Sequence, residues 1–471
     1  MQFKDGHYIV PLPWKNQNAV LPDNHKLAQR RYDLLEKRFM RDPELKQRYS
    51  EFMKNMMTKG YMEEVDEKTY VGSKAWYIPR HPVVNEKKPG KIRVVFDCAA
   101  KYAGVALNDL LLQGPDINNT LIGVLIKFRA ERIALTADIE SIFLQVIVKE
   151  QDRDSLRFYW RPVDGQPIKT FRMTRHLFGA TCSPACANTT LRRTLEDHGM
   201  KYCVEARQAM KENFYVDDCL ASAPDQMKAV RMIKDLSNLC LDGGFHLTKW
   251  LSNDKEVLNT VPEAERAPEL KSLDLNNDDL PTGRTLGVQW SPQLDTLSFN
   301  IAAAERNYTR RGILSITSSV FDPLGLVAPF ILPAKMLLQD LCRQGLGWDE
   351  LIDDFSMQRW RIWLEELKRL KEWSMPRCYK SNLSSNIISI QLHVFSDASE
   401  KGYGMCAYLK QEAQDGTIQV SLVLARSRVA PLKYVSIPRM ELKMCIRDRW
   451  QPDQEVEYQG SLLLDRQPDC S

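Results

Sequence analysis

The chain has 471 residues, of which 44% are hydrophobic and 27% charged, a composition typical of a globular protein with about two to four domains. No apolar run reaches the roughly 20 residues that span a bilayer, and the start, "MQFKDGHYIV", lacks the apolar segment of a signal peptide. Neither membrane insertion nor secretion is therefore indicated. The net charge of +4 is too small to indicate a nucleic-acid partner by itself.

The eleven cysteines are odd in number and irregularly spaced, which favours reduced thiols over a disulfide framework. No C-x-x-C occurs, and Cys182-x-x-x-Cys186 has no second ligand pair nearby in the sequence. A structural zinc site is therefore not expected. Two basic runs, "HKLAQRRYDLLEKRFMRD" and "NEKKPGKIRVVFD", are more simply explained as solvated helix faces or turns.

In chain order, the first predicted elements are two helices between residues 23 and 60. Apolar side chains recur there at helical spacing. Asp42 suits the cap and Pro43 the first turn of the second helix, and Gly60 suits its end. Short strands and turns are expected over residues 75–112.

Residues 132–148 predict a strand that breaks around Asp138 and then continues as apolar sequence. A helix is predicted to begin at Ser183-Pro184 and to end at Gly199.

A further helix is predicted over residues 225–242, which end at a Gly-Gly pair. Its apolar face is expected to comprise Met227, Val230, Ile233 and Leu236. The polar, acidic stretch 262–284 predicts a linker or long loop, and a mostly helical section follows to about residue 373. Strict alternation over 388–394 then predicts a strand, and "YGMCAYL" and "VSLVLA" predict two more.

Two adjacent carboxylates, Asp217 and Asp218, interrupt the apolar hairpin sequence "FYVDDCLAS". Adjacent carboxylates repel each other unless a cation lies between them, and Mg²⁺ is a cation that prefers such oxygen ligands. Asp138, at the end of the apolar strand "IALTAD", is a candidate third carboxylate. A lone Asp-Asp pair is usually only a turn. This pair does not stand alone, because Phe143, Phe178-Gly179 and Ser183-Pro184 precede it along the chain in that order. The combination favours a two-metal site.

From about residue 5 to residue 442, the chain resembles reverse transcriptases, and the polymerases of BEL/Pao-type LTR retrotransposons in particular. The motifs that carry the resemblance are "DGHYIVPLPW", "KIRVVFDCAAKYAGVALNDLL", "LTADIESIFLQV", "HLFGATCSPACAN", "FYVDDCLAS", "GGFHLTKWLSN", "TLGVQW", "FDPLGLVAPF" and "FSDASEKGYG…SRVAPLK…IPRMEL". The resemblance implies an α+β, right-hand polymerase fold of fingers, palm and thumb or connection, followed by an incomplete ribonuclease H-like α/β domain.

The resemblance also implies a division of the chain into domains. The expected parts are a helical lead-in (1–74), fingers and palm (75–300), a helical thumb or connection (301–375), a partial ribonuclease H-like domain (386–442) and an atypical tail (443–471) that is a candidate for chimeric origin.

By the same resemblance, Asp138, Asp217 and Asp218 are the expected catalytic carboxylates, holding two Mg²⁺ ions, with Mn²⁺ as an alternative. Asp218 is expected to contribute less direct ligation than the other two. Ile139 is expected at the metal site through its backbone carbonyl.

The resemblance implies six nucleotide-binding residues: Lys91, Arg93, Phe143, Gly179, Tyr215 and Lys249. Phe143 falls where a bulky aromatic side chain excludes a ribose 2′-OH and so selects deoxynucleotides; its alternative role is that of a core residue. Arg93, and less closely Lys91, match cations that hold the incoming triphosphate. For Lys249, a solvated surface role is equally favoured.

"VFSDAS" and "IPRMEL" resemble two parts of a ribonuclease H domain, which implies Asp397 and Glu441 as remnants of its metal-binding set. After Leu442 the helical periodicity is expected to stop at once. The ribonuclease H unit is therefore expected to be incomplete and inactive.

The leading hypothesis is an RNA-directed DNA polymerase whose partners are an RNA or DNA template with its primer and dNTPs, without a membrane. The alternative is a degraded or co-opted element product that binds nucleic acid without polymerising. A third reading, an RNA-directed RNA polymerase, is disfavoured by Phe143. The implied location is intracellular, in a cytoplasmic particle or the nucleus, and the oligomeric state is left open.

Overall fold

The computed structural model describes residues 1–66, 74–84, 92–270, 280–281, 283–301, 307–380, 383 and 386–447. The chain divides into two compact units. The first comprises Met1–Asn119, Asp138–Cys219 and Arg231–Thr248, and the second comprises Thr120–Ala137, Leu220–Val230 and Lys249–Ser471.

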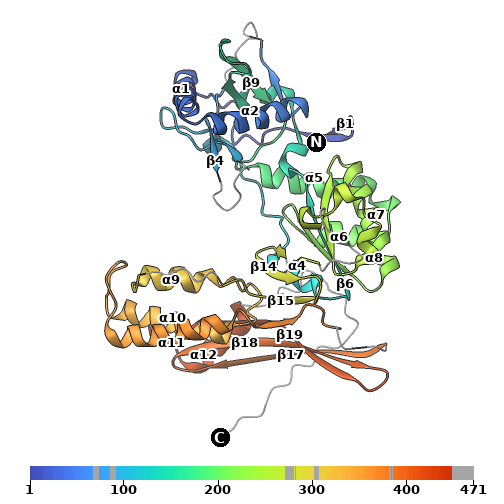
Figure 1. The fold of residues 1–471 in the computed structure, drawn as a ribbon, viewed down its shortest axis with the longest axis vertical. Coiled ribbons are helices and arrows are strands. Elements are labelled where there is room, and N and C mark those ends of the chain that lie inside the picture. The colour runs from blue at the N-terminus through green and yellow to red at the C-terminus, as the bar shows by residue number, and fades with distance from the viewer. Residues whose placement is uncertain are drawn as a thin grey trace. The chain divides into compact units, whose positions relative to one another are not determined.

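The first unit opens with the predicted helix pair, α1 (His25–Arg41) and α2 (Pro43–Thr58) (Figure 1). The Asp42 carboxylate accepts a hydrogen bond from the Leu45 N–H at 3.0 Å, and Pro43 lies in the first turn of α2. The start of a helix leaves N–H groups without partners. Asp42 accepts a hydrogen bond from one of them, and Pro43 has no N–H that would need one. The sequence prediction for this region is confirmed.

Three small sheets complete the N-terminal part of this unit. They are β1 (Gln2–Lys4), β2 (His7–Val10) and β7 (Ile147–Val148); β3 (Met62–Glu64), β9 (Lys169–Met173) and β8 (Arg157–Trp160); and β4 (Arg80–Val84) with β5 (Ile92–Phe96). Their apolar faces and the helix pair share one core cluster, in which Trp76, Phe158 and Phe171 are fully buried.

A fourth sheet has the strand order β10-β11-β6-β12. Its strands are β6 (Ile133–Ile139), β10 (Phe214–Tyr215), β11 (Asp218–Ala223) and β12 (Leu247–Ser252). The longer helices that accompany these strands along the chain are α5 (Ser183–His198), α6 (Val204–Glu212) and α7 (Gln226–Asp242). The helix predicted to start at Ser183-Pro184 is confirmed.

Helix α7 confirms the predicted element and most of its predicted face. Ile233 and Leu236 are buried and Val230 is half-buried, whereas Met227, in the first turn, is 80% exposed. Ala229 and Met232 are buried as well, so the covered face begins two positions later than expected.

The second unit contains α4 (Leu121–Phe128) and a sheet of order β13-β14-β15-β16. The strands are β13 (Gly283–Thr285), β14 (Val288–Ser291), β15 (Thr296–Ser298) and β16 (Ser374–Pro376). The predicted helical section is confirmed as α9 (Arg310–Ser319), α10 (Ala328–Arg343) and α11 (Asp354–Arg369). Trp360 and Trp363 stack at 4.8 Å between ring centroids within its core.

The three predicted C-terminal strands are confirmed as an antiparallel sheet of β17 (Ile387–Ala398), β18 (Gly402–Ala413) and β19 (Ile418–Val429). Helix α10 packs against β19, and α12 (Ile437–Arg447) packs against β17 and β18 (Figure 1). The apolar side of β17 is only partly covered within the described residues, since Ile388 is 64% and Val394 50% exposed.

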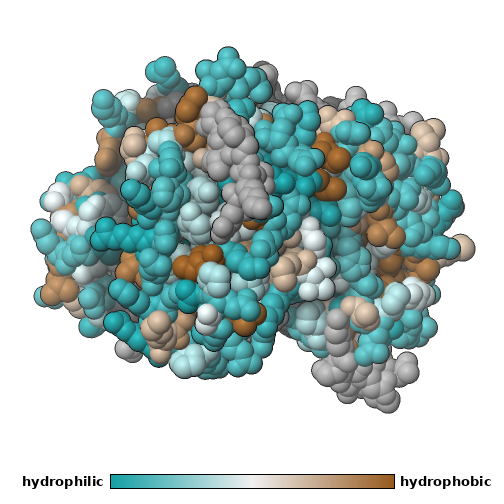
Figure 2. Space-filling view, turned by 90° about the horizontal axis from the view of Figure 1, so that it is seen from above, coloured by the Kyte–Doolittle hydropathy of each residue, from teal (hydrophilic) through white to brown (hydrophobic). Residues whose placement is uncertain are grey.

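Shorter elements connect these parts: α3 (Leu107–Leu110), η1 (Ile142–Gln145), η2 (Glu150–Leu156), η3 (Gly199–Lys201), α8 (Lys255–Asn259), η4 (Glu263–Glu265) and η5 (Pro268–Leu270). The face of the molecule in Figure 2 is mostly hydrophilic, with apolar side chains scattered in small groups. Across the described part of the chain, no helix combines the length and apolar character needed to cross a membrane.

Two buried arginines connect distant segments of the second unit. Arg377 is fully buried, and its guanidinium donates hydrogen bonds to the carbonyls of Phe128, Glu131 and Arg132. The same side chain makes a two-pronged ion pair with Asp295, at 2.6 and 2.8 Å. A buried guanidinium is stable only when its donors are satisfied in this way.

Arg129 is also buried, at 1% exposure. It donates to the carbonyls of Arg377 and Leu422 at 3.0 and 2.9 Å, and it lies over the Tyr379 ring at 4.3 Å. Because Leu422 belongs to β19, these contacts tie the end of α4 to the C-terminal sheet within the same unit.

We expect Arg377→Met to lower the free energy of unfolding of this unit by about 3–5 kcal/mol, because it removes the ion pair with the Asp295 carboxylate and the hydrogen bonds to the three carbonyls. The matched control is Arg311→Met, which removes an ion pair with Asp349 between side chains that are 65% and 72% exposed; it should leave stability nearly unchanged. Urea unfolding followed by tryptophan fluorescence measures both. Equal effects of the two variants would contradict the expectation.

Candidate active site

The two adjacent aspartates lie at the tip of the β10–β11 hairpin. Phe214 pairs with Cys219 and Tyr215 with Asp218, so Val216 and Asp217 form the two-residue turn. The Phe214 and Cys219 side chains are buried, whereas both aspartates and Tyr215 are half-buried. The apolar flanks therefore anchor the hairpin, and its tip presents the carboxylates.

Val216 adopts a left-handed backbone conformation, with φ +59°. This region is unfavourable for a β-branched residue and costs on the order of 1–3 kcal/mol. Strain of this kind persists only where the surrounding structure determines the conformation. The turn that carries Asp217 is therefore held in place by its neighbours.

The neighbour that holds it is the end of β6. The Ile139 N–H donates a hydrogen bond to the Asp217 carbonyl at 2.9 Å. Ile139 is fully buried, and Asp138, immediately before it, is half-buried. The structure thus brings together the four residues expected at the metal site, Asp138, Ile139, Asp217 and Asp218.

A further carboxylate, Glu140, was not predicted. Its oxygens lie 2.7 Å from Lys59 Nζ and 3.0 Å from His246 Nδ1, and its N–H donates to the His246 carbonyl at 2.9 Å. The Lys59 hydrogen bond, and then that of His246, lower the pKa of Glu140, and Glu140 in turn raises the pKa of Lys59. The sequence contains little sign of this role for Glu140 beyond its position two residues after Asp138. Its partners, Lys59 and His246, are remote from it in the chain.

Phe143 and the loop before α5 pack against each other. The rings of Phe143 and Phe178 lie 4.4 Å apart between centroids. Phe143 is 7% and Phe178 46% exposed, so the loop covers Phe143 from the solvent side. This placement is compatible both with the predicted role in sugar selection and with a core role.

Gly179 is required by the close approach of two backbones. Its φ is +115°, and a Cβ added there would lie 2.2 Å from the Phe96 carbonyl oxygen. The Gly179 carbonyl also accepts a hydrogen bond from Asn108 Nδ2 at 2.9 Å. The loop is therefore fixed against the end of β5, the strand that carries Arg93.

The remaining predicted nucleotide-binding residues are placed as follows. Arg93 is exposed on β5 and pairs with Val83 in the β4–β5 ribbon. Lys91 lies outside the described residues. Lys249 is exposed in β12, has φ +58°, and belongs to the second unit.

The expected ribonuclease H remnant lies in the second unit. Asp397 is exposed on β17, opposite Gly404, and Glu441 is half-buried on α12. Helix α12 continues to Arg447. The expected end of its apolar periodicity after Leu442 stays a prediction. Residues 448–471 of the predicted tail lie outside the described residues.

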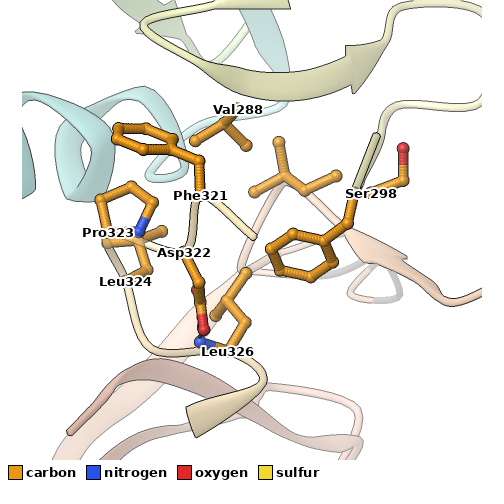
Figure 3. Close-up of a pocket in the computed structure, with 9 residues that line it drawn as sticks. Val288, Ser298, Phe321, Asp322, Pro323, Leu324 and Leu326 are labelled. Atoms are coloured by element: carbon orange, nitrogen blue, oxygen red, sulfur yellow. Dashed lines mark hydrogen bonds between the residues drawn. The ribbon is translucent and has the colours of Figure 1, made fainter. Parts of the chain in front are cut away.

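The "FDPLGL" motif forms a small apolar pocket with β14 and β15 in the second unit, and none of the predicted site residues lines it (Figure 3). The Asp322 carboxylate accepts hydrogen bonds from the Leu326 and Val327 N–H groups, both at 2.8 Å. Burial raises the pKa of Asp322, while those N–H groups oppose the shift. A Cβ on Gly325 would lie 1.7 Å from the Ala425 carbonyl oxygen, so the motif serves to dock α10 against β19.

Comparison with known proteins supplies the family context. Residues 309–447 match the family model described as the Pao retrotransposon-like RNaseH-like domain. A search of curated proteins found no match.

Among solved structures, the foamy viral protease-reverse transcriptase dRH in complex with double-stranded DNA is similar with a TM-score of 0.52, 16% identity and coverage of 83% of this chain and 57% of that one. The foamy viral protease-reverse transcriptase in complex with an RNA/DNA hybrid has a TM-score of 0.53 and 14% identity, and the match covers 94% of this chain and 50% of that one. Its complex with double-stranded DNA has a TM-score of 0.53 and 14% identity, and the match covers 91% of this chain and 74% of that one. The chain therefore has a reverse transcriptase-like fold, and its residues 309–447 are similar to the Pao retrotransposon-like RNaseH-like domain.

At 14–16% identity these matches establish the reverse transcriptase fold alone, and the chain spans just over half of the first structure (57%) and half of the second (50%). The predicted fold class and the predicted resemblance to Pao-type reverse transcriptases are confirmed. The predicted domain boundaries and the roles of individual site residues stay predictions.

We expect Glu140→Gln to destabilise the reverse transcriptase fold at neutral pH but not in acid. Since the pKa of Glu140 is held below its ordinary 4.5, its ionised form contributes stability that is full above that value and is lost as the pH falls through the lowered pKa. The side chain is 38% exposed, so the loss at about pH 7 should be about 1 kcal/mol or less.

Urea unfolding of wild type and variant at about pH 7 and about pH 3 measures this difference. The matched control is Glu64→Gln, whose pair with Lys169 is more exposed, at 50% for the glutamate. A Glu140→Gln effect of the same size at both pH values would refute the assignment.

Proposed function

We propose that this chain is an RNA-directed DNA polymerase of an LTR retrotransposon of the BEL/Pao type. The observation that carries the proposal is the hydrogen bond from the Ile139 N–H to the Asp217 carbonyl. It places the aspartate that ends β6 beside the strained turn that presents Asp217 and Asp218. Two segments about 80 residues apart in the chain thereby supply one set of carboxylates, as metal-dependent nucleotidyl transfer requires.

The partners that fit this proposal are a primed RNA or DNA template and dNTPs. The similar solved structures are complexes with double-stranded DNA and with an RNA/DNA hybrid, which supports nucleic acid as the class of partner.

The donor set at the hairpin tip fits Mg²⁺. Asp138, Asp217 and Asp218 offer hard carboxylate oxygens and are half-buried, and magnesium is commonly held by one or two carboxylates together with substrate phosphates. When bound, the ions would activate the primer 3′-OH and stabilise the pyrophosphate that leaves. The Ile139 carbonyl is the proposed additional ligand.

The protein's own contribution is to position these groups. The Ile139–Asp217 hydrogen bond and the buried flanks Phe214 and Cys219 hold the carboxylates before substrate arrives, so little reorganisation is needed on binding. Arg93, on the strand fixed against the Gly179 loop, is the proposed cation for the triphosphate. Lys91 and Lys249 are proposed as weaker contributors on sequence grounds alone.

The proposal predicts primer extension by the purified full chain with a DNA primer on an RNA template, dNTPs and Mg²⁺. Asp217→Asn should reduce the rate by at least about 100-fold, because it removes one metal-binding charge. The matched control is Asp164→Asn. Asp164 is 76% exposed and pairs with Lys46 at the surface. This variant should extend the primer at the wild-type rate.

Extension that is equal in wild type and Asp217→Asn would refute the assignment of the site. No extension by folded wild-type protein that still binds the primed duplex would refute polymerisation and support a nucleic-acid binder instead. Repeating the assay with a DNA template separates RNA-directed from general template use.

A second prediction concerns sugar selection by Phe143. Phe143→Leu should raise the ratio of ribonucleotide to deoxyribonucleotide incorporation by about tenfold or more, because the smaller side chain leaves room for a 2′-OH. The control is Phe178→Ala, which removes the ring packed on Phe143 but leaves Phe143 itself in place.

Single-nucleotide incorporation kinetics with dNTPs and rNTPs measure the ratio for each variant. An unchanged ratio in Phe143→Leu, together with a lower melting temperature, would show that Phe143 is only a core residue.

A further inference from the structure

Three potential metal ligands, none of them among the aspartates of the candidate site, converge in the first unit. One ligand atom each from His176, Cys182 and Cys186 lies within 4.8 Å of the other two. The side chains are 1%, 0% and 8% exposed, respectively. A histidine and two cysteines in this arrangement form a ligand set that Zn²⁺ commonly uses.

The His176 ring is already oriented as a ligand. Its Nε2 lies 3.2 Å from the Val10 carbonyl oxygen, and a carbonyl can only accept, so Nε2 carries the proton. Nδ1 therefore has a free lone pair. It is buried and has no hydrogen-bond partner among the residues that the structure describes.

A buried nitrogen without a hydrogen-bond partner is destabilising unless a donor or a metal ion meets its lone pair. Metal-binding histidines typically donate their second N–H to a backbone carbonyl, as His176 does.

The two cysteines lie on consecutive turns at the start of α5. Cys182 precedes the helix and Cys186 follows one turn later, and residues four apart lie on the same side of a helix. Their sulfur atoms lie within 4.8 Å of each other and of a His176 ring nitrogen. Cysteines bind metal ions as thiolates, so binding here would release the thiol protons.

Cys98 is the nearest candidate for a fourth ligand. It is fully buried, at 1% exposure. Its Sγ would lie 3.9 Å from a Cβ added at Gly179, so it belongs to the contact between β5 and the loop before α5.

We propose that His176, Cys182 and Cys186 bind one Zn²⁺ ion that anchors the loop between β9 and α5. The loop so anchored carries Phe178 and Gly179, which contact Phe143 and the Phe96 carbonyl. The site is structural, and the proposal does not depend on polymerase activity.

The test uses the full chain purified with zinc in the medium and dialysed extensively. Metal analysis should find about one Zn²⁺ per chain, and Cys182→Ser, Cys186→Ser and His176→Gln should each reduce it to near zero. Replacement by Co²⁺ should give the intense thiolate-to-cobalt absorption in wild type, which carboxylate sites cannot produce.

The matched controls are Cys219→Ser and Cys240→Ser, which change equally buried cysteines of the same unit. They should keep the metal and the cobalt spectrum, and they control for the cost of burying a serine hydroxyl. Circular dichroism confirms that each variant is folded.

Folded wild-type protein that retains no zinc and gives no thiolate–cobalt band would overturn the proposal. So would equal zinc retention in the Cys186→Ser variant, or a Cys182–Cys186 disulfide found by mass spectrometry in the freshly purified chain. None of these outcomes bears on primer extension, so failure of this proposal is distinct from failure of the proposed function.

Discussion

The arrangement of the candidate site depends on one backbone hydrogen bond, from the Ile139 N–H to the Asp217 carbonyl. Carboxylate side chains repel each other and cannot by themselves draw two segments together. The peptide groups are neutral, so they can fix the segments at short range while the charges stay half-buried. The strained Val216 turn is tolerated because this contact and the buried hairpin flanks hold it.

Successive contacts extend from that point through the first unit. Glu140, next to Ile139, is held by Lys59 and His246. Phe143 follows in the same turn region and packs on Phe178. Gly179 then brings its loop against the backbone of β5. Each link uses a different interaction, and together they relate the carboxylates to the strand that bears Arg93. In the second unit, buried Arg377 plays the corresponding role for the C-terminal sheet.

Local sequence patterns predicted the elements well where the determining interactions are themselves local. The α1–α2 pair follows from apolar spacing and from Asp42 and Pro43 at the boundary. The β17 strand follows from strict alternation. The same reasoning misplaced only the start of the buried face of α7, where Met227 is exposed, because packing partners decide which part of a helix is covered.

The sequence by itself identified the candidate site, because adjacent aspartates in an apolar hairpin and an aspartate at the end of an apolar strand are costly unless a cation or a hydrogen-bond donor pairs with them. Only the tertiary structure decided which side chains from distant parts of the sequence come into contact. Glu140 meets Lys59 across 81 positions, and His176 meets the two cysteines through the course of the loop before α5. Spacing in the sequence does not predict such contacts. Hydrogen bonds and metal ligation act over a few ångströms in space, whatever the distance between the residues along the chain.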